Sequence, residues 1–560
     1  MKTARYCLTL ILLFSVTASA ADPVNLLHKD AAVVVRLKAP DTTVKDLTAF
    51  IDTVQPGFGA VVQGQASTLG LAINNPTLAG VDMSRDWYIM LFASAKPPLQ
   101  PVLLIPTNDV QAFKDALGPR FAVAVKDDWI AYSSESSLLE AVQSGFDSST
   151  DSLSAVQSDS LLEDFDKGHL SVLVNSPALQ ATFVSQLANA EQSLEQGLDQ
   201  LEAMVQQSGQ QMPAGSIRTA YGRIGQKLIQ AARDSKGAII RLEANGTELR
   251  IEERFVFAND SVTQKALARH TVSDLAPLTA LPQGLPLYFA GQFEIDELLE
   301  WSEEVMGLVV ADPESNKVFQ KSFAAMKSVD FGVVAGAVDL STAPGAALSY
   351  LATAEVSQAK KLRDAFAEMG SSMKYEVAGI TQSMKYTRNA ESVGGKAVDL
   401  YEFKQKIPPE MDPTGIQKAM NQRLYGGDTI TQRMIFEDDR LLQLLGGTAE
   451  DLQPLLNPVP WTDANLLDAR KRLYPTANLV MFADVPDLLL SSTKLLAESP
   501  MVPLPLSVDQ LAQLVIQPSY AGISVSLENG ELNARTNLPA EMFQQIARTV
   551  FMVQIMMNGQ

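Results

Sequence analysis

The chain has 560 residues, of which 46% are apolar and 19% charged, and its formal net charge is −20. This composition is typical of a well-buried globular protein and excludes a disordered acidic tail. So negative a chain repels phosphate backbones and anionic surfaces, and the sequence has no segregated run of basic residues. We therefore expect no nucleic acid among its partners.

The first twenty residues have the pattern of a secretory signal peptide. Lys2 and Arg5 precede an apolar run that starts at Cys7, and small residues follow up to Ala20. This order predicts cleavage between Ala20 and Ala21 and export to the periplasm or cell envelope, or secretion. No later window of about 20 residues is free of charge and proline, so no transmembrane segment is expected after removal of residues 1–20.

Cys7 is the single cysteine, and it lies inside the predicted signal. The mature chain would therefore have neither a disulfide nor a thiol nucleophile. Its stability must come from core packing, for which a chain of this length suffices in two or more domains.

Apolar runs and amphipathic segments predict an α+β arrangement for the first half, residues 21–275. Strands are expected at 31–37, 87–93, 101–106, 121–125, 129–133 and 168–175. Helices are expected at 41–54, at 110–117 with Thr107 or Asn108 as the cap, and in a helical hairpin at about 177–235. The Ser- and Asp-rich stretch 144–166 is expected to be a solvated connection.

The same order of elements recurs in the second half, residues 276–560. Strands are expected at 287–290, 330–339, 346–352 and 477–483, and helices at 295–305, 357–369 and 539–557. A shorter helical pair is expected at 487–516, and residues 370–427 form an insertion with a strand at 396–403. The recurrence predicts two pseudo-repeated halves, each a mainly antiparallel sheet with packed helices and an inserted helical hairpin.

Each half has a hairpin with Asn-Gly at its turn. Asn245-Gly246 and Asn529-Gly530 each separate two alternating apolar runs. A type I′ turn needs positive φ at both central residues, which Asn tolerates and Gly adopts freely. We therefore predict type I′ turns at equivalent corners of the two halves.

Two acidic turns carry a family resemblance. Asp127-Asp128 and Asp438-Asp439 are each followed by an apolar strand and a helix start with small residues, and the mature chain would begin with the lead DPVNLLHKDAAVVVRL. In these features the chain resembles uncharacterised bacterial secreted proteins of unknown function, which repeat a unit of turn, aromatic residue, apolar strand and serine. The resemblance implies this organisation for most of the mature chain and implies no activity.

The sequence has no recognisable catalytic, cofactor or metal motif. His28, His169 and His270 are far apart and none forms H-x-x-x-H, and no G-x-S-x-G is present. The two Asp-Asp pairs fit a hypothesis in which one carboxylate is a catalytic general acid and the other is its partner. Asp is, however, also favoured at exposed turns. Residues 163–168 have alternating carboxylates before a glycine, as in a calcium loop, but lack its distal Glu. We therefore predict no catalytic, cofactor-binding or metal-binding residue.

Three function hypotheses follow. The first is a non-enzymatic, exported cell-envelope protein that binds or assembles with a partner. The second is a periplasmic carrier of lipid or another apolar ligand, and the third is a hydrolase whose site is assembled from dispersed residues. The C-terminal helix, rich in Met between 542 and 557, is either core or an interface.

Overall fold

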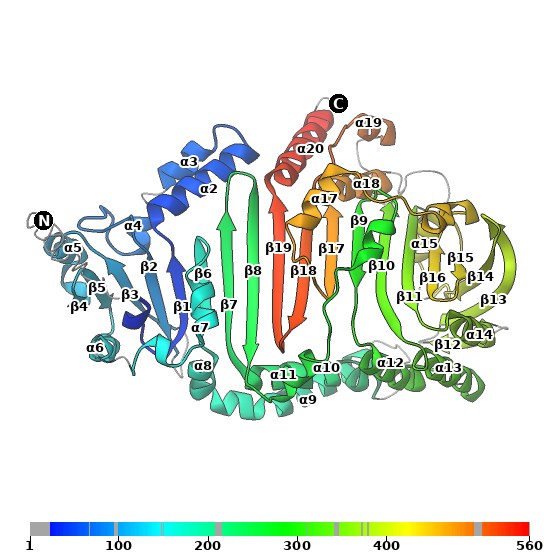
Figure 1. Ribbon diagram of the computed structural model, residues 1–560, viewed down its shortest axis with the longest axis horizontal. Coiled ribbons are helices and arrows are strands. Elements are labelled where there is room, and N and C mark those ends of the chain that lie inside the picture. Colours follow the sequence, from blue (N-terminus) through cyan, green and yellow to red (C-terminus); the bar gives the residue numbers. More distant parts are fainter. Residues whose placement is uncertain are drawn as a thin grey trace, which may run out of the picture. The chain divides into compact units, whose positions relative to one another are not determined.

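The computed structural model describes residues 23–558 except 66–67, 94–98, 147, 149, 208–214, 311, 341–346, 371–372, 378–379, 411 and 498–506. The chain divides into two compact units. The first contains the described residues up to Thr48, Ala60–Val184 and Lys236–Glu243, and the second contains Ala49–Gly59, Ser185–Ser235 and the rest from Ala244. The strand pairs described here are antiparallel, which together with the many helices confirms the α+β class (Figure 1).

The strands of the first unit pair in the order β4–β5–β3–β2–β1–β6–β7. The strands are β1 Ala31–Leu37, β2 Trp87–Phe92, β3 Gln100–Pro106, β4 Ala122–Lys126, β5 Trp129–Ser133, β6 Leu170–Val174 and β7 Ser235–Ala244. The helices up to β6 and directly after it are η1 Pro23–Leu26, α2 Pro40–Val54, α3 Gly59–Gln65, α4 Thr68–Ala72, α5 Val110–Leu117, η2 Gly118–Arg120, α6 Ser136–Gly145, η3 Leu153–Ala155, α7 Asp159–Phe165 and α8 Ser176–Thr182.

The strands of the second unit pair in the order β8–β19–β18–β17–β9–β10–β11–β16–β15–β14–β13–β12. The strands are β8 Glu248–Phe257, β9 Leu287–Gly291, β10 Phe331–Leu340, β11 Leu348–Val356, β12 Met373–Val377, β13 Ile380–Val393, β14 Lys396–Lys406, β15 Thr429–Phe436, β16 Arg440–Leu445, β17 Leu479–Asp484, β18 Tyr520–Glu528 and β19 Glu531–Pro539. The helices are α9 Val184–Gln207, α10 Ser216–Asp234, α11 Val262–Leu267, η4 Ala276–Ala280, α12 Asp296–Val309, α13 Pro313–Met326, α14 Ala359–Gly370, α15 Ile416–Tyr425, η5 Ala449–Leu452, α16 Gln453–Leu456, α17 Ala464–Lys471, α18 Val485–Ala497, α19 Val508–Ala512 and α20 Ala540–Asn558.

The two strand orders match element for element. The order β4–β5–β3–β2–β1–β6–β7 of the first unit corresponds to β15–β16–β11–β10–β9–β17–β18 of the second. Strands β12 to β14 have no counterpart in this match and come from the predicted insertion at 370–427. The chain therefore repeats one topology, as its order of elements predicts, whereas the boundary between residues 275 and 276 stays a prediction.

The last strands of the two repeats, β8 and β19, pair with each other in a self-complementary register. When the two Asn-Gly turns are aligned, Glu248 corresponds to Leu532 and Phe255 to Pro539. Glu248 pairs with Pro539, and Leu532 pairs with Phe255. Exchanging the two strands therefore reproduces the same set of pairs.

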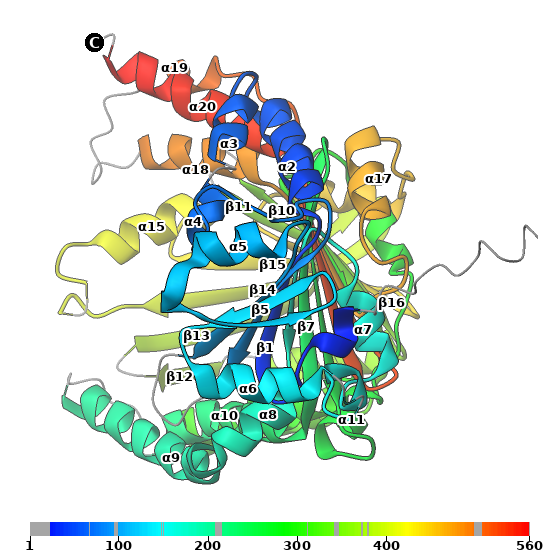
Figure 2. The same cartoon turned by 90° about the vertical axis from the view of Figure 1, so that its left-hand side faces the viewer.

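One face of the second unit's sheet carries its main core. Tyr288 of β9 and Phe482 of β17 are fully buried there, together with alternate residues of β10. Trp461 covers them, because its indole N–H donates to the Leu281 carbonyl at 3.0 Å and its ring packs on Tyr288. Helix α17 adds Leu466 to the same cluster. Figure 2 shows α17 on this side of the strands, whereas α18 and α20 lie toward the other side.

The predicted helical hairpin is present as α9 and α10, which pack antiparallel within the second unit. Leu198 of α9 is buried, and Arg233 near the end of α10 binds Glu191 near the start of α9 at 2.6 Å. The turn expected at 211–215 falls largely outside the described residues. The first residues of the predicted hairpin, from 177, form the separate helix α8 and not the start of α9.

Two local predictions for the first unit are wrong. Asp109, and not Thr107 or Asn108, caps α5, because its carboxylate accepts from the N–H groups of Gln111 and Ala112 at 3.0 Å each. The Thr107 hydroxyl instead donates to the Gly80 carbonyl. The stretch 144–166 is not solvated throughout, because two of the three apolar residues of α7, Leu161 and Phe165, are buried in the core.

The two Asn-Gly turns differ in conformation. Asn529 and Gly530 have φ of 56° and 76°, as a type I′ turn requires. Neither Asn245 nor Gly246 has a left-handed φ, so the type I′ prediction is wrong there. The reason is the Asn245 side chain, whose carbonyl oxygen accepts from the backbone N–H groups of Thr247 and Glu248 and holds a longer loop.

Because the two turns differ in conformation, replacing glycine with valine should lower the free energy of unfolding by different amounts at Gly530 and Gly246. Gly530→Val should destabilise the protein by roughly 1 to 3 kcal/mol, because a β-branched residue is strained at positive φ. Gly246→Val should cost less than about 1 kcal/mol, because φ is ordinary there and a Cβ would meet no atom within 4 Å. Thermal unfolding of the two variants measures both, and equal losses would contradict the turn assignment.

Candidate functional site

The second face of the sheet in the second unit is apolar but only partly covered. Strands β9, β10 and β17 are apolar on both sides, whereas an antiparallel sheet with one solvated face normally alternates apolar and polar residues. On the side away from Tyr288 and Phe482, Met481 is 38% exposed. The half-buried apolar residues on that side include Phe289, Val334, Val338, Tyr350, Leu479, Ile523 and Val525. We call this surface, with Met481, Gly291 and Gly336, the apolar face.

The strand register places these side chains in rows. One row runs from Val525 through Leu479 and Gly291 to Val334, and the next runs from Ile523 through Met481 and Phe289 to Gly336. From β18 to β10 these rows cross three spacings of about 4.8 Å, or about 14 Å in total. The apolar face is therefore a continuous surface and not a set of isolated side chains.

A hollow of about 240 Å³ lies within the apolar face. It is lined by Phe289, Gly291, Phe293, Ile295, Phe331, Gly332, Val334 and Leu479. None of these residues carries a charge, so the hollow offers a ligand contact with hydrocarbon and little else. An engineered apolar cavity of about 150 Å³ stays dry and binds benzene, so a hollow of this size and lining suits a hydrocarbon group.

Glycine shapes the surface next to this hollow. The rings of Phe289 and Tyr350 are parallel, with centroids 5.9 Å apart, and Gly336 lies beside both. A Cβ at Gly336 would come within 2.6 Å of Phe289 and 2.8 Å of Tyr350. A larger residue would therefore displace the two rings and change the wall of the hollow.

The first unit has a comparable apolar face on its own sheet. Val33 and Val35 of β1 lie in register with Leu91 and Ile89 of β2 and with Val174 and Val172 of β6. These side chains are half-buried, and Ile240 in the adjacent β7 is 39% exposed. The same face is thus apolar in both copies of the repeated topology.

No family model and no curated protein matches the chain. Among solved structures, crystal forms III and I of a protein titled TP0453 are 12% identical to this chain and cover 48% and 49% of it, with 97% of their own length matched. Their TM-scores are 0.21 and 0.18, which is too little similarity to support an argument about function.

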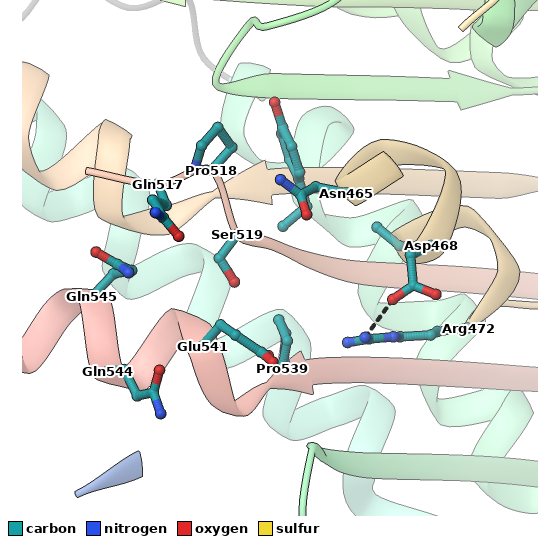
Figure 3. Close-up of a pocket in the computed structure, with 12 residues that line it drawn as sticks. Asn465, Asp468, Arg472, Gln517, Pro518, Ser519, Pro539, Glu541, Gln544 and Gln545 are labelled. Carbon is teal, nitrogen blue, oxygen red and sulfur yellow. Dashed lines mark hydrogen bonds and ion pairs between the residues drawn. The ribbon is translucent and has the colours of Figure 1, made fainter. Parts of the chain in front are cut away.

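A second, polar pocket of about 250 Å³ lies between α17, the segment before β18 and α20 (Figure 3). Two of its charged groups pair with each other, because Arg472 binds Asp468, and Arg472 also approaches Glu248 at 3.5 Å. The Gln544 amide donates to the Thr53 carbonyl. These contacts hold neighbouring elements of the second unit together, so we regard this pocket as structural.

The histidines do not converge on either pocket. His169 binds Asp46 of α2 at 2.9 Å, and His28 lies beside Asp30, where burial lowers its pKa. The His270 ring accepts from the N–H of Glu294. Each ring therefore stabilises its own part of the fold, and neither the apolar hollow nor the polar pocket includes one.

The acidic motifs lie at turns and in ion pairs. Asp127-Asp128 connects β4 to β5, and Asp438-Asp439 connects β15 to β16. In the segment 163–168, which has the pattern of a calcium loop, the Asp164 carboxylate forms an ion pair with Arg241 at 2.9 Å. Within the described ranges, no group of three or more His, Cys, Asp and Glu side chains could hold a metal. The predicted cleavage residues Ala20 and Ala21 lie outside the described residues.

The C-terminal helix α20 is core at its start and exposed at its end. Met542 and Thr549 are buried, and Phe543 packs edge-on against Phe50. In its last two turns Phe551 and Ile555 are 62% and 51% exposed. Among the described helices, none has the length and apolar character needed to cross a membrane.

Proposed function

We propose that this protein binds an acyl-chain ligand on the apolar face of its second unit and acts as a carrier. The observation that supports this proposal is the combination of half-buried apolar rows with an adjoining hollow that is lined by uncharged residues. Apolar patches that a folded protein leaves open mark interaction sites, because their exposure to water costs free energy. The comparable face in the first unit is consistent with a repeated function.

The dimensions favour an acyl chain over a compact apolar molecule. One leaflet of a bilayer contains acyl chains about 15 Å long, half of the roughly 30 Å hydrocarbon core. The rows of the apolar face extend about 14 Å from β18 to β10. A chain of that length can lie along the rows with part of it in the hollow.

Export to the cell envelope is part of the same proposal. A carrier of acyl chains is useful where lipid must cross an aqueous compartment, and the first twenty residues have the pattern of a secretory signal. We expect N-terminal sequencing of the protein from its own host to begin at Ala21. A sequence that begins at Met1 in the cytoplasmic fraction would contradict export.

A titration with a fluorescent fatty acid tests the function. The wild type should bind, and Met481→Asp should bind at least tenfold more weakly, because an ionised carboxylate at the centre of the apolar face must lose water when hydrocarbon covers it. Met481 is 38% exposed, so the substitution is compatible with folding. Melting temperatures of both proteins check that the fold is retained.

Val459→Asp is the matched control. Val459 is 69% exposed and lies between α16 and α17, which pack on the opposite side of the sheet, so this variant should bind as the wild type does. Equal affinities of Met481→Asp and wild type would refute the carrier proposal. The rival hypothesis is that the protein assembles with a partner protein. Native mass spectrometry of protein from its own host tests it, because a bound partner protein that is lost in Met481→Asp would indicate assembly through the apolar face.

A further inference from the structure

A pocket lined by lysines lies in the insertion that interrupts the repeat. This pocket of about 510 Å³ is formed by one face of β12, β13 and β14 together with the start of α15. Its lining includes four lysines and two hydroxyl residues, namely Lys374, Lys404, Lys406, Lys418, Thr381 and Ser383. In a chain with 44 basic and 64 acidic residues, such a concentration of lysine is unexpected.

The strand register brings three of these lysines to one surface. Lys374 pairs with Ser383, and Ser383 pairs with Lys404, so the three residues form one row across the strands. Lys406 is two residues beyond Lys404 and pairs with Thr381, which places it on the same side. Lys374 and Lys404 are two strand spacings apart, or about 10 Å.

The lysines of the pocket have no carboxylate partner in the part of the chain that the structure describes. This contrasts with other lysines of the same strands, because Lys385 binds Glu402 at 3.2 Å and Lys396 binds Glu437 at 2.9 Å. Like charges that lie close together without counter-charges repel each other, so the cluster has an unfavourable electrostatic free energy in the absence of an anion.

Two aspartates also line the pocket, and one is already engaged. The Asp412 carboxylate accepts from the backbone N–H groups of Gln417 and Lys418, at 3.2 and 3.0 Å, and so caps α15. Asp428 is exposed and lines the pocket as well. Among the described residues that line the pocket, four lysines therefore outnumber two aspartates, and their summed charge is positive.

We propose that this pocket binds a ligand with two phosphate-type anionic groups. Lysine binds phosphate as a point charge with three donors, and the Ser383 and Thr381 hydroxyls supply neutral donors between the charges. Two linked phosphates offer more acceptor oxygens and more negative charge than one phosphate to four lysines that are spread over about 10 Å of the sheet. The volume falls in the range of about 300 to 1,000 Å³ that is usual for small-molecule sites.

Calorimetry with inorganic pyrophosphate tests the proposal on the full chain, with inorganic phosphate as the single-anion comparison. We expect pyrophosphate to bind more tightly than phosphate and to lose affinity as salt is raised. The double variant Lys404→Gln/Lys406→Gln should bind pyrophosphate at least tenfold more weakly. Both side chains are exposed, so the fold should be retained.

Two further variants make the result specific. Lys404→Arg/Lys406→Arg keeps the charges and should retain most of the affinity. Lys385→Gln removes an ion-paired lysine of the same strands and should change nothing. Equal loss in Lys385→Gln and in Lys404→Gln/Lys406→Gln would overturn the proposal, because the effect would then follow net charge alone.

Vesicles distinguish a lipid headgroup from a soluble anion. Phosphatidylcholine vesicles with and without cardiolipin, whose headgroup has two phosphates, are compared in a flotation assay. Binding to cardiolipin vesicles that is lost in Lys404→Gln/Lys406→Gln supports a headgroup ligand, and binding of pyrophosphate alone supports a soluble one. Binding of neither would overturn the proposal.

Discussion

Asp399→Ala is expected to destabilise the second unit by about 3 to 5 kcal/mol, because it removes one partner of a buried ion pair. Asp399 lies on β14 and is 1% exposed. Its two oxygens each accept from the Arg363 guanidinium of α14 at 2.6 Å, and the Tyr386 hydroxyl and the Asn389 N–H donate to them as well. Alanine would remove the acceptor of the Tyr386 hydroxyl, the Asn389 N–H and the Arg363 Nε–H, and would leave Arg363 with the Asn389 side-chain oxygen at 2.8 Å.

The charge state of Asp399 supports this magnitude. Burial by itself would raise the pKa of Asp399, but the hydrogen bonds from Arg363 and Tyr386 hold it below its ordinary value. The carboxylate is therefore ionised at neutral pH. Its contribution to stability is present above the unfolded pKa of about 3.8 and is lost as the pH falls through the folded value.

Urea unfolding of three variants measures the effect. Asp364→Ala is the control, because Asp364 lies on the same helix as Arg363 but is 70% exposed, and its pair with Arg388 should contribute less than about 1 kcal/mol. Arg363→Met/Asp399→Leu should recover much of the loss, since no buried charge is left alone. A loss in Asp399→Ala no larger than in Asp364→Ala would contradict the prediction.

Asp484→Asn is expected to stabilise the protein by about 2 kcal/mol at pH 7.5. Asp484 ends β17, is 4% exposed, and accepts from the N–H of Asp487 at 3.3 Å at the start of α18. Burial raises the pKa of Asp484 to about 6. A shift of about two units corresponds to roughly 3 kcal/mol between the two protonation states, and Asn keeps the acceptor without the charge.

The sign of the pH dependence follows from the raised pKa. The folded protein retains the Asp484 proton more readily than the unfolded chain, so this group stabilises the fold fully below the unfolded pKa of 3.8. That stability is lost as the pH rises through about 6. Melting temperatures at pH 4.5 and 7.5 should therefore show a gain for Asp484→Asn mainly at the higher pH.

Asp509→Asn is the control for Asp484→Asn. Asp509 lies in the first turn of α19 and is exposed, so its loss should give no gain at either pH. A gain for Asp484→Asn that is the same at pH 4.5 and 7.5 would contradict the buried-carboxylate explanation.

Much of the fold could be predicted because the structure that the local sequence pattern favours is the one that the residues adopt in the folded chain. The apolar runs around Val480 and Tyr288 predict strands, and β17 and β9 are there. The repeated order of elements predicts the repeated topology. Strands β12 and β13 were not predicted, because β12 has only five residues and β13 is mostly polar. Their pairing with each other and with β14 stabilises them as strands.

The candidate sites could be predicted only in part. A continuous apolar strand such as β17 indicates two apolar faces but does not say which of them the helices leave open. Gly291 and Gly332 are distant in sequence and meet only when β9 and β10 pair. The expectation that the chain has no segregated basic patch is corrected by the lysine pocket, because Lys374 and Lys404 come together only through the strand between them.

The register between β8 and β19 bears on how such a chain can arise. A pairing that is unchanged when its two strands are exchanged is the geometry of an isologous contact, which two identical subunits form across a twofold axis. A shorter ancestor with one copy of the topology would meet its own twin at this strand in the same register. Gene fusion would then turn a homodimer contact into an internal one, and each copy would be free to diverge, as the one-sided insertion of β12 to β14 illustrates.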